Sequence, residues 1–122
     1  MRVLIVEDET ALAQVFWDYV EQLGHRGIVA PNAEVALEKL SREQPDVILL
    51  DVRLPDSDGF TVARTLRADR YTQHIPIIFL SGRSEPSDRV EALEIGADDF
   101  VAKPFDAQEL RLRIERVLKA RR

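Results

Sequence analysis

Residues 47–51 read Val-Ile-Leu-Leu-Asp, four apolar residues that run without interruption into an aspartate. Three more apolar runs end on residues with reactive side chains, and these are 3–6 before Glu7-Asp8, 77–80 before Ser81 and the weaker 100–102 before Lys103. Unbroken runs of this length, separated by helix-like stretches, are typical of parallel strands covered on both faces. Because parallel strands end at one edge of a sheet, where open α/β folds bind ligands, we expect these side chains to meet there.

The composition indicates an ordinary globular domain spanning residues 1–122, with 45% hydrophobic and 32% charged residues. The absence of cysteine excludes a disulfide framework and a thiolate zinc site, and it suits a reducing compartment, so we expect a cytoplasmic protein. The first apolar run is too short for a signal peptide or a membrane span. The net charge of −5 argues against general nucleic-acid binding by this domain.

The segments between the runs have the three- and four-residue apolar spacing of amphipathic helices. The expected inward residues are Leu12, Val15, Phe16, Tyr19, Val20 and Leu23 in the first helix, Val35, Ala36, Leu37 and Leu40 in the second, and Val62, Ala63 and Leu66 in the third. Trp17 lies off the first stripe and is expected at the surface. Asn32 is expected to cap the second helix, a fourth helix runs through Leu93, and the last begins at about Asp106.

A weak strand is expected at residues 28–30, mainly because a parallel sheet needs one between the first two helices. The chain then consists of five βα units with no internal linker or repeat. This alternation predicts an α/β fold, a single doubly wound sheet of five parallel strands with five helices.

The carboxylates of Glu7, Asp8 and Asp51 would crowd negative charge at one edge of this sheet. Such crowding raises the pKa values of the carboxyl groups unless a nearby cation neutralises their charge. Lys103 at the neighbouring strand end is one candidate, and a hard divalent cation is the other, for which oxygen-only ligands favour Mg²⁺. The alternative is that the acidic run only begins a helix, stabilised by the helix dipole. For Glu9 that interpretation is preferred, whereas Asp51 and Lys103 favour a functional role for the acidic pair.

Asp51 follows a buried strand, where an unpaired carboxylate is energetically expensive. It can therefore serve as a metal ligand or as a nucleophile that forms an acyl phosphate in phosphoryl transfer. Positioning and charge neutralisation supply most of the catalysis in that reaction. In this hypothesis the cation bridges attacking and phosphoryl oxygens, while Lys103 and Ser81 meet other phosphoryl oxygens.

The whole chain resembles the receiver domain of bacterial two-component response regulators, and in particular the receivers of winged-helix DNA-binding transcription regulators. The matching residues, in the order and spacing of that family, are Glu7-Asp8, Asp51, Leu54-Pro55-x-x-Asp58-Gly59, Ser81-Gly82, Gly96-Ala97-Asp98-Asp99-Phe100 and Lys103-Pro104-Phe105. Each motif alone is weak, but together they are highly specific. The resemblance implies a flavodoxin-like strand order, 2-1-3-4-5.

The resemblance also implies the function, a phosphorylation-activated signalling switch rather than an enzyme. A sensor histidine kinase or a phosphotransfer protein would donate the phosphoryl group to Asp51, and the domain would assist its own phosphotransfer and dephosphorylation. The implied Mg²⁺ ligands are Glu7, Asp8, Asp51 and the backbone carbonyl of Arg53. Lys103 would contact the phosphoryl group, and its bond to Pro104 would be cis.

The switch implied by the resemblance consists of Ser81, which would turn towards the phosphoryl group, and Phe100, which would swing inward into the space left behind. Phenylalanine stands at position 100 where tyrosine is also common, so no hydroxyl hydrogen bond can hold the inward state. Arg53 and Arg83 occupy positions that tune the hydrolysis of the acyl phosphate in the family. They are alternatively two solvated loop arginines.

An output face is expected on the last two helices, because Leu110, Ile114, Val117 and Leu118 form the inward stripe of the last helix and leave Leu112 on another face. The predicted face consists of Arg89, Val90, Leu93, Asp99, Glu109, Leu112 and Arg113. A small apolar patch with mixed charges at its rim suits a partner surface. The resemblance implies a homodimer that forms on phosphorylation, in which Arg89 meets Glu109 of a second copy and Asp99 meets its Arg113. The last helix's arginines could instead simply complement its dipole.

Three other functions fit the sequence less well than the switch. An aspartyl-nucleophile phosphatase on a similar fold needs a second acid two residues after the nucleophile, where this chain has Arg53. A nucleotide- or flavin-binding module needs a glycine-rich phosphate loop after the first strand, where this chain is acidic. An interaction domain that is never phosphorylated usually lacks the acids or the lysine, all of which are present. The kinase, the regulated process and the presence of an effector domain beyond residue 122 stay open.

Overall fold

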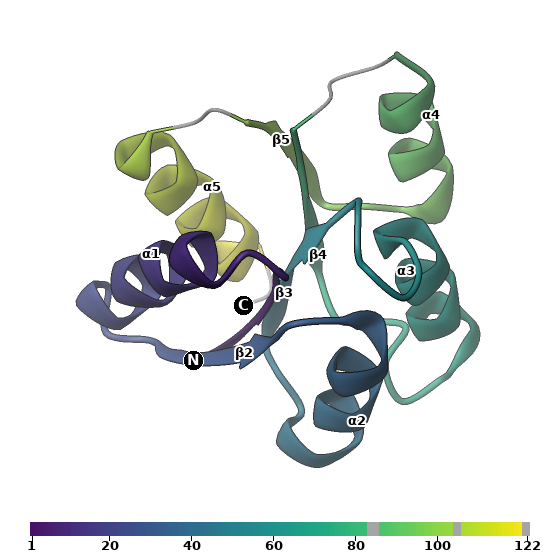
Figure 1. Cartoon of the computed structure of the whole chain (residues 1–122), viewed down its shortest axis with the longest axis horizontal. Coiled ribbons are helices and arrows are strands. Elements are labelled where there is room, and N and C mark those ends of the chain that lie inside the picture. The colour runs from purple at the N-terminus through teal and green to yellow at the C-terminus, as the bar shows by residue number, and fades with distance from the viewer. Residues whose placement is uncertain (83–85, 104–105, 121–122) are drawn as a thin grey trace.

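The computed structural model describes residues 1–82, 86–103 and 106–120, within which five strands alternate with five helices (Figure 1). In chain order they are β1 (Arg2–Val6), α1 (Thr10–Gln22), β2 (Arg26–Ala30), α2 (Ala33–Glu43), β3 (Val47–Asp51), α3 (Gly59–Ala68), β4 (Ile77–Ser81), α4 (Pro86–Ile95), β5 (Asp99–Ala102) and α5 (Ala107–Lys119). In this described part of the chain, none of the helices has the length and apolar character needed to cross a membrane. The predicted alternation of strands and helices is confirmed.

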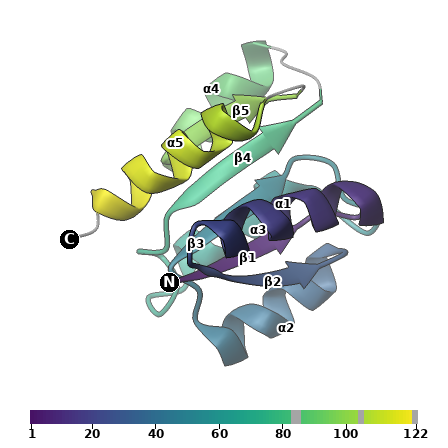
Figure 2. The same cartoon turned by 90° about the vertical axis from the view of Figure 1, so that its left-hand side faces the viewer.

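The sheet is parallel throughout and has the order β2-β1-β3-β4-β5, as predicted. Even the weak strand is present, and β2 pairs along its full length with β1. Helices α1 and α5 cover one face of the sheet, and α2, α3 and α4 cover the other (Figure 1). Figure 2 shows α1 and α5 together in front of the sheet.

Two cores result, because successive side chains of a strand point to opposite faces of the sheet. In β3, Ile48 and Leu50 pack towards α2 and α3, while Val47 and Leu49 pack towards α1 and α5. Every residue of β3 is buried, including the terminal Asp51. The central strand therefore carries its carboxylate to the sheet edge from within the core.

Three predicted helix positions are wrong. Val15 and Leu37, expected to face inward, are 39% and 38% exposed. Trp17, expected at the surface, is partly buried and donates its indole N–H to the carbonyl of Gly27 at 3.2 Å. The apolar spacing gave the two stripes, but their edges depend on how close each helix lies to the sheet. At Gly27 the absence of a side chain lets the indole ring approach the strand, since a Cβ there would lie 2.5 Å from the ring.

Gly59 brings α3 against the end of β3. Its N–H donates to the carbonyl of Val52 at 2.8 Å, and a Cβ at this position would lie 2.3 Å from the backbone oxygen of Asp51. Asp58 caps the same helix by accepting from the N–H of Thr61 at 2.8 Å. The turn after β3 thus has no room for a side chain beside the Asp51 backbone.

Gly59→Ala is therefore expected to lower the free energy of unfolding by about 1–3 kcal/mol, the usual cost of forcing extra volume into a packed site. The contacting atoms are backbone, so they cannot rotate away. Urea denaturation monitored by circular dichroism measures the effect. The matched control is Gly82→Ala, whose Cβ meets nothing within 4 Å. Equal stability of the two variants would contradict this reading of the turn.

Candidate functional site

The carboxyl edge of the sheet carries the chemically active side chains singled out in the sequence. Asp51 ends β3, Ser81 ends β4, Glu7 and Asp8 follow β1, and Lys103 follows β5. The ammonium group of Lys103 donates to Glu7 Oε1 at 2.9 Å and to Asp51 Oδ2 at 3.2 Å. Lys103 lies 96 positions from Glu7 and 52 positions from Asp51 in the chain, and the three side chains form one ion-paired group.

Burial of the Glu7, Asp51 and Lys103 group shifts the pKa values of some of its members. Glu7 is 2% exposed and Asp51 is 5% exposed. Burial raises the pKa of Glu7 to about 7, the hydrogen bond from Lys103 opposes the rise, and the negative charge of Asp51 adds to it. Burial alone would lower the pKa of Lys103, but the hydrogen bond that Lys103 donates to Glu7 and the charges of both acids outweigh it, so its pKa is raised.

Glu7, Asp8 and Asp51 also have the geometry of a cation site. One carboxylate oxygen from each lies within 4.8 Å of the others, and Asp8 is exposed to solvent beside its two buried neighbours. Three hard oxygen donors with no nitrogen or sulfur ligand fit Mg²⁺. Bound there, Mg²⁺ would supply neutralisation of the carboxylates and of an incoming phosphoryl group.

Arg53 contacts the site through its backbone. Its N–H donates to Asp51 Oδ1 at 3.1 Å and so helps to orient the carboxylate. The predicted ligand role of its carbonyl stays a prediction. Pro104 and Arg83 lie outside the described residues, so the cis bond after Lys103 and the role of Arg83 are also left as predictions.

Ser81 and Phe100 lie on the same face of the sheet in neighbouring strands. Ser81 pairs in register with Ala102, and Phe100 pairs with Phe79. The backbone N–H of Lys103 donates to the carbonyl of Ser81 at 2.6 Å, which ties the two strand ends together. Ser81 is 1% exposed, whereas Phe100 is only partly buried against the core under α2, α3 and α4. The switch role of Ser81 and Phe100 stays a prediction.

A pH dependence follows from the buried acid. The pKa of Glu7 is raised in the folded chain, so its protonated form stabilises the fold below its ordinary pKa, and this contribution is lost as pH rises through about 7. A cation must displace that proton. Mg²⁺ affinity is therefore expected to rise about tenfold between pH 6 and pH 8, since the ionised fraction of Glu7 rises by about that factor.

Calorimetric titration at the two pH values measures this change, with Glu7→Gln as the control. That variant should bind Mg²⁺ more weakly and without the pH dependence. An affinity that stays constant from pH 6 to pH 8 in the wild-type protein would contradict the combination of a raised Glu7 pKa and a ligand role for Glu7.

The predicted output face is exposed and apolar at its centre. Val90 is 54% exposed, Leu93 75% and Leu112 52%. Asp99, Glu109 and Arg113 are ion-paired within the chain, however. Asp99 accepts from Arg113 Nη1 at 2.7 Å and from Arg116 Nη2 at 3.0 Å.

Two contacts on this face were missed by the sequence analysis. Arg116 lies one helical turn beyond Arg113, a spacing that could have indicated a shared partner. The guanidinium carbon of Arg89 lies 4.9 Å from the centre of the Phe100 ring. No sequence signal joins α4 to β5 in this way, because the contact depends on how the helix packs over the strand.

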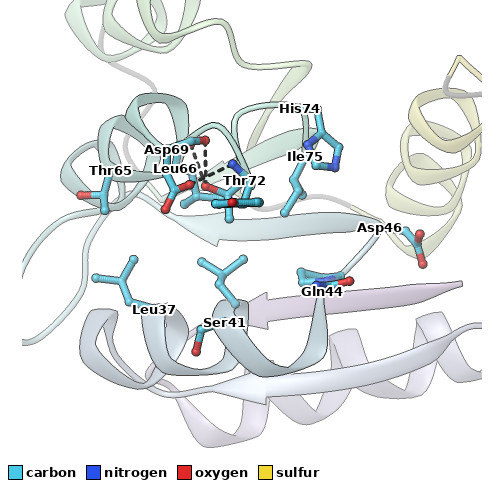
Figure 3. Close-up of a pocket in the computed structure, with 13 residues that line it drawn as sticks. Leu37, Ser41, Gln44, Asp46, Thr65, Leu66, Asp69, Thr72, His74 and Ile75 are labelled. Carbon is cyan, nitrogen blue, oxygen red and sulfur yellow. Dashed lines mark hydrogen bonds between the residues drawn. The ribbon is translucent and has the colours of Figure 1, made fainter.

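A groove of about 670 Å³ lies elsewhere in the described part of the chain. It opens between α2 and α3 at the amino ends of the strands, with Leu37 and Ser41 on one side and Leu66 and Thr72 on the other (Figure 3). Its polar groups serve local structure, since Asp46 accepts from the backbone of Arg2 and Thr72 donates to the carbonyl of Leu66. The groove lacks the convergent charges of the carboxyl edge.

The chain is similar to known proteins over nearly all of its length. A family model described as the response regulator receiver domain matches residues 3–115. The phosphate regulon transcriptional regulatory protein PhoB of Escherichia coli (strain K12) is 38% identical over 118 residues, which are 97% of this chain and 52% of PhoB. The probable transcriptional regulator ycf27 of Guillardia theta is 38% identical over 97% of this chain and 45% of its own length.

Solved structures show the same fold. The receiver domain of the Francisella response regulator 1452 superposes with a TM-score of 0.91 at 30% identity, covering 99% of this chain and 98% of that one. This chain thus matches a receiver structure over nearly all of its length, while it spans about half the length of the curated relatives.

Proposed function

This chain belongs to the response regulator receiver domain family, whose members are phosphorylation-dependent signalling switches, and we propose that Asp51 is its phosphoryl acceptor. The observation that carries the assignment is the buried Asp51 carboxylate at the end of the central strand, ion-paired to Lys103. Burial of a carboxylate costs free energy, and ionisable groups in such surroundings are concentrated at functional sites.

The chemistry is the transfer of a phosphoryl group to a carboxylate. An oxygen of Asp51 forms the new bond to phosphorus while the bond between phosphorus and the donor's histidine nitrogen breaks, which leaves an acyl phosphate. Lys103 is placed 3.2 Å from Asp51 Oδ2, where its ammonium group can neutralise charge on the transferred group. Glu7, Asp8 and Asp51 would hold Mg²⁺, with the Arg53 carbonyl as a further ligand.

The partners are part of the proposal. Receiver domains of response regulators interact with histidine kinases, and we infer that a sensor kinase or a phosphotransfer protein is the donor here. The curated relatives are transcriptional regulators about twice as long as this chain, and control of transcription through an effector is likewise proposed. Assistance to its own dephosphorylation, tuned by Arg53 and Arg83, completes the proposed cycle.

The test is direct phosphorylation of the wild-type chain by acetyl phosphate in the presence of Mg²⁺, followed by intact-mass measurement and peptide mapping. One phosphoryl group is expected, on the peptide that contains Asp51, and removal of Mg²⁺ with a chelator should prevent its addition. A chain that stays unmodified under these conditions would refute the proposed function.

The switch would connect this chemistry to the output face. The phosphoryl group adds acceptors at the strand edge, which would draw Ser81 towards it and open space for the Phe100 ring. Phe100 is half-buried on the same sheet face as Ser81, one strand away. The group can favour the inward state only by interacting better with it than with the outward state.

The output proposed is a homodimer through α4, β5 and α5. Since Asp99 already has two arginine partners in its own chain, an intermolecular pair with Arg113 would exchange one ion pair for another and add little affinity. The affinity must then come from the exposed apolar side chains at the centre of the face, Val90, Leu93 and Leu112.

Leu112→Asp is accordingly expected to abolish dimer formation induced by beryllofluoride, a stable mimic of the phosphoryl group. A carboxylate at the centre of an apolar interface would be buried without a partner. Analytical ultracentrifugation should show a monomer-to-dimer shift for the wild type and none for the variant. Leu37→Asp is the control, at a leucine on α2 that is 38% exposed and lies outside the output face, and this variant should still dimerise. A wild-type protein that stays monomeric with the mimic bound would contradict the proposed dimer.

A further inference from the structure

Arg89 is the basic residue that lies against the aromatic side chain of the proposed switch. It belongs to α4 and is exposed, and its guanidinium carbon lies 4.9 Å from the centre of the Phe100 ring. That distance is within the range of a cation–π contact. Among the described residues, the second contact of this kind joins Arg70 to its neighbour Tyr71 and does not connect separate elements.

The Phe100 ring lies at the border between the buried core and the exposed side chain of Arg89. Phe100 pairs with Phe79 in the sheet, and Phe79 is fully buried with its ring 5.0 Å from that of Phe60. Phe100 is less buried than Phe79 and Phe60, and the guanidinium group of Arg89 lies over its ring. Inward movement of the Phe100 ring would withdraw it from the exposed guanidinium, so the cation–π contact stabilises the outward position.

Arg89 also has an alternative partner. In the proposed dimer it faces Glu109 of a second copy, while in the single chain Glu109 pairs with Arg113 at 3.3 Å. The guanidinium group of Arg89 thus has two competing interactions, the cation–π contact with Phe100 of its own chain and an ion pair with Glu109 of a second copy. The same side chain therefore links the position of Phe100 to the formation of the dimer.

We propose that Arg89 is a positioning residue that acts through Phe100: its contact with the ring holds the switch outward in the unphosphorylated chain and lowers the response to phosphorylation. This inference rests on the proposed function, since it requires a phosphoryl group that favours the inward ring. A cation–π contact at an exposed site shifts such an equilibrium about two- to fivefold. Removing it should raise the affinity for a phosphoryl mimic by that factor, because the outward state competes with binding.

The experiment is a titration with beryllofluoride in the presence of Mg²⁺, followed by NMR, in a Leu112→Asp background that keeps the protein monomeric. Arg89→Ala is expected to bind beryllofluoride about two- to fivefold more tightly than the parent. The sign is diagnostic, because loss of a positive charge would by simple electrostatics weaken the binding of an anion. Arg89→Lys, which retains a cation able to contact the ring, should restore most of the parent affinity.

Two controls separate the ring contact from a general effect on α4. Arg64→Ala removes another cation that contacts α4, through Glu91, but does not touch the ring, and it should leave the affinity unchanged. In a Phe100→Leu background, Arg89→Ala should have no effect, because the partner of the contact is gone.

Equal affinities of the parent and Arg89→Ala would overturn the proposal, as would an increase that persists without the Phe100 ring. Those results would leave the proposed function intact, since beryllofluoride would still bind. A parent protein that fails to bind beryllofluoride at all would instead refute the proposed function and this inference together.

Discussion

Asp51→Asn is expected to abolish Mg²⁺-dependent labelling of the protein by acetyl phosphate. The amide is neutral and much less nucleophilic than a carboxylate, so it cannot form the acyl phosphate. The side chain is nearly the same size, and Asp51 is 5% exposed, so the substitution tests chemistry rather than packing. Replacing the anion also removes one of the two acids that Lys103 contacts, and the fold is expected to survive that loss because Glu7 remains.

The matched control for this prediction is Asp58→Asn, seven positions further along the chain. Asp58 caps α3 through the N–H of Thr61, a role that asparagine fills about equally well. Labelling of Asp58→Asn should match that of the wild type, measured by intact mass after equal exposure to acetyl phosphate. Undiminished labelling of Asp51→Asn, mapped to Glu7 or Asp8, would refute the assignment of the acceptor.

Asp8→Ala is expected to weaken Mg²⁺ binding by at least about tenfold, as loss of a supporting group at a metal site commonly does. Asp8 supplies the exposed member of the three carboxylates whose oxygens lie within 4.8 Å of one another. Two hard ligands cannot replace three, whereas the exposed position means that the fold tolerates the change. Calorimetric titration with Mg²⁺ gives the affinity, and thermal denaturation without metal should show little difference from the wild type.

Glu9→Ala provides the comparison, since Glu9 stands next in the chain and precedes α1 without capping it through its side chain. Its Mg²⁺ affinity should equal that of the wild type if the cation lies where the three carboxylates meet. Equal affinities for the wild type and Asp8→Ala would mean that the acidic pair serves only as the start of a helix.

The sheet was predictable from the sequence because its signals are local. Four of the five strands are short apolar runs that lead into a polar residue at the same edge of a parallel sheet, and the weak strand at residues 28–30 was expected mainly because such a sheet needs it. The identity of the edge residues therefore followed from the position of Asp51 after residues 47–50 and of Lys103 after residues 100–102. The helix cap at Asn32 was equally local, since its side chain accepts from the backbone N–H three residues ahead.

The sequence alone also predicted a chemistry for the site, which stays a prediction. Oxygen-only acids, a lysine and a strand-end aspartate in this order predict phosphoryl transfer with Mg²⁺, whatever the exact distances. It could not determine protonation. The raised pKa of Glu7 depends on the depth of its burial and on the competing influences of Lys103 and Asp51, and all three are properties of the packed structure.

Only the tertiary structure decided which partners the charged and aromatic side chains of the output face take. The family resemblance implies that Asp99 meets Arg113 of a second copy, which stays a prediction, and within the single chain the structure pairs Asp99 with Arg113 and Arg116. The tertiary structure also places the guanidinium group of Arg89 over the Phe100 ring. It leaves Val15 and Leu37 exposed and Trp17 partly buried. Periodicity fixes which residues share a helix face, but contact between elements depends on how closely each helix packs on the sheet, and that distance is set by side chains remote in the sequence.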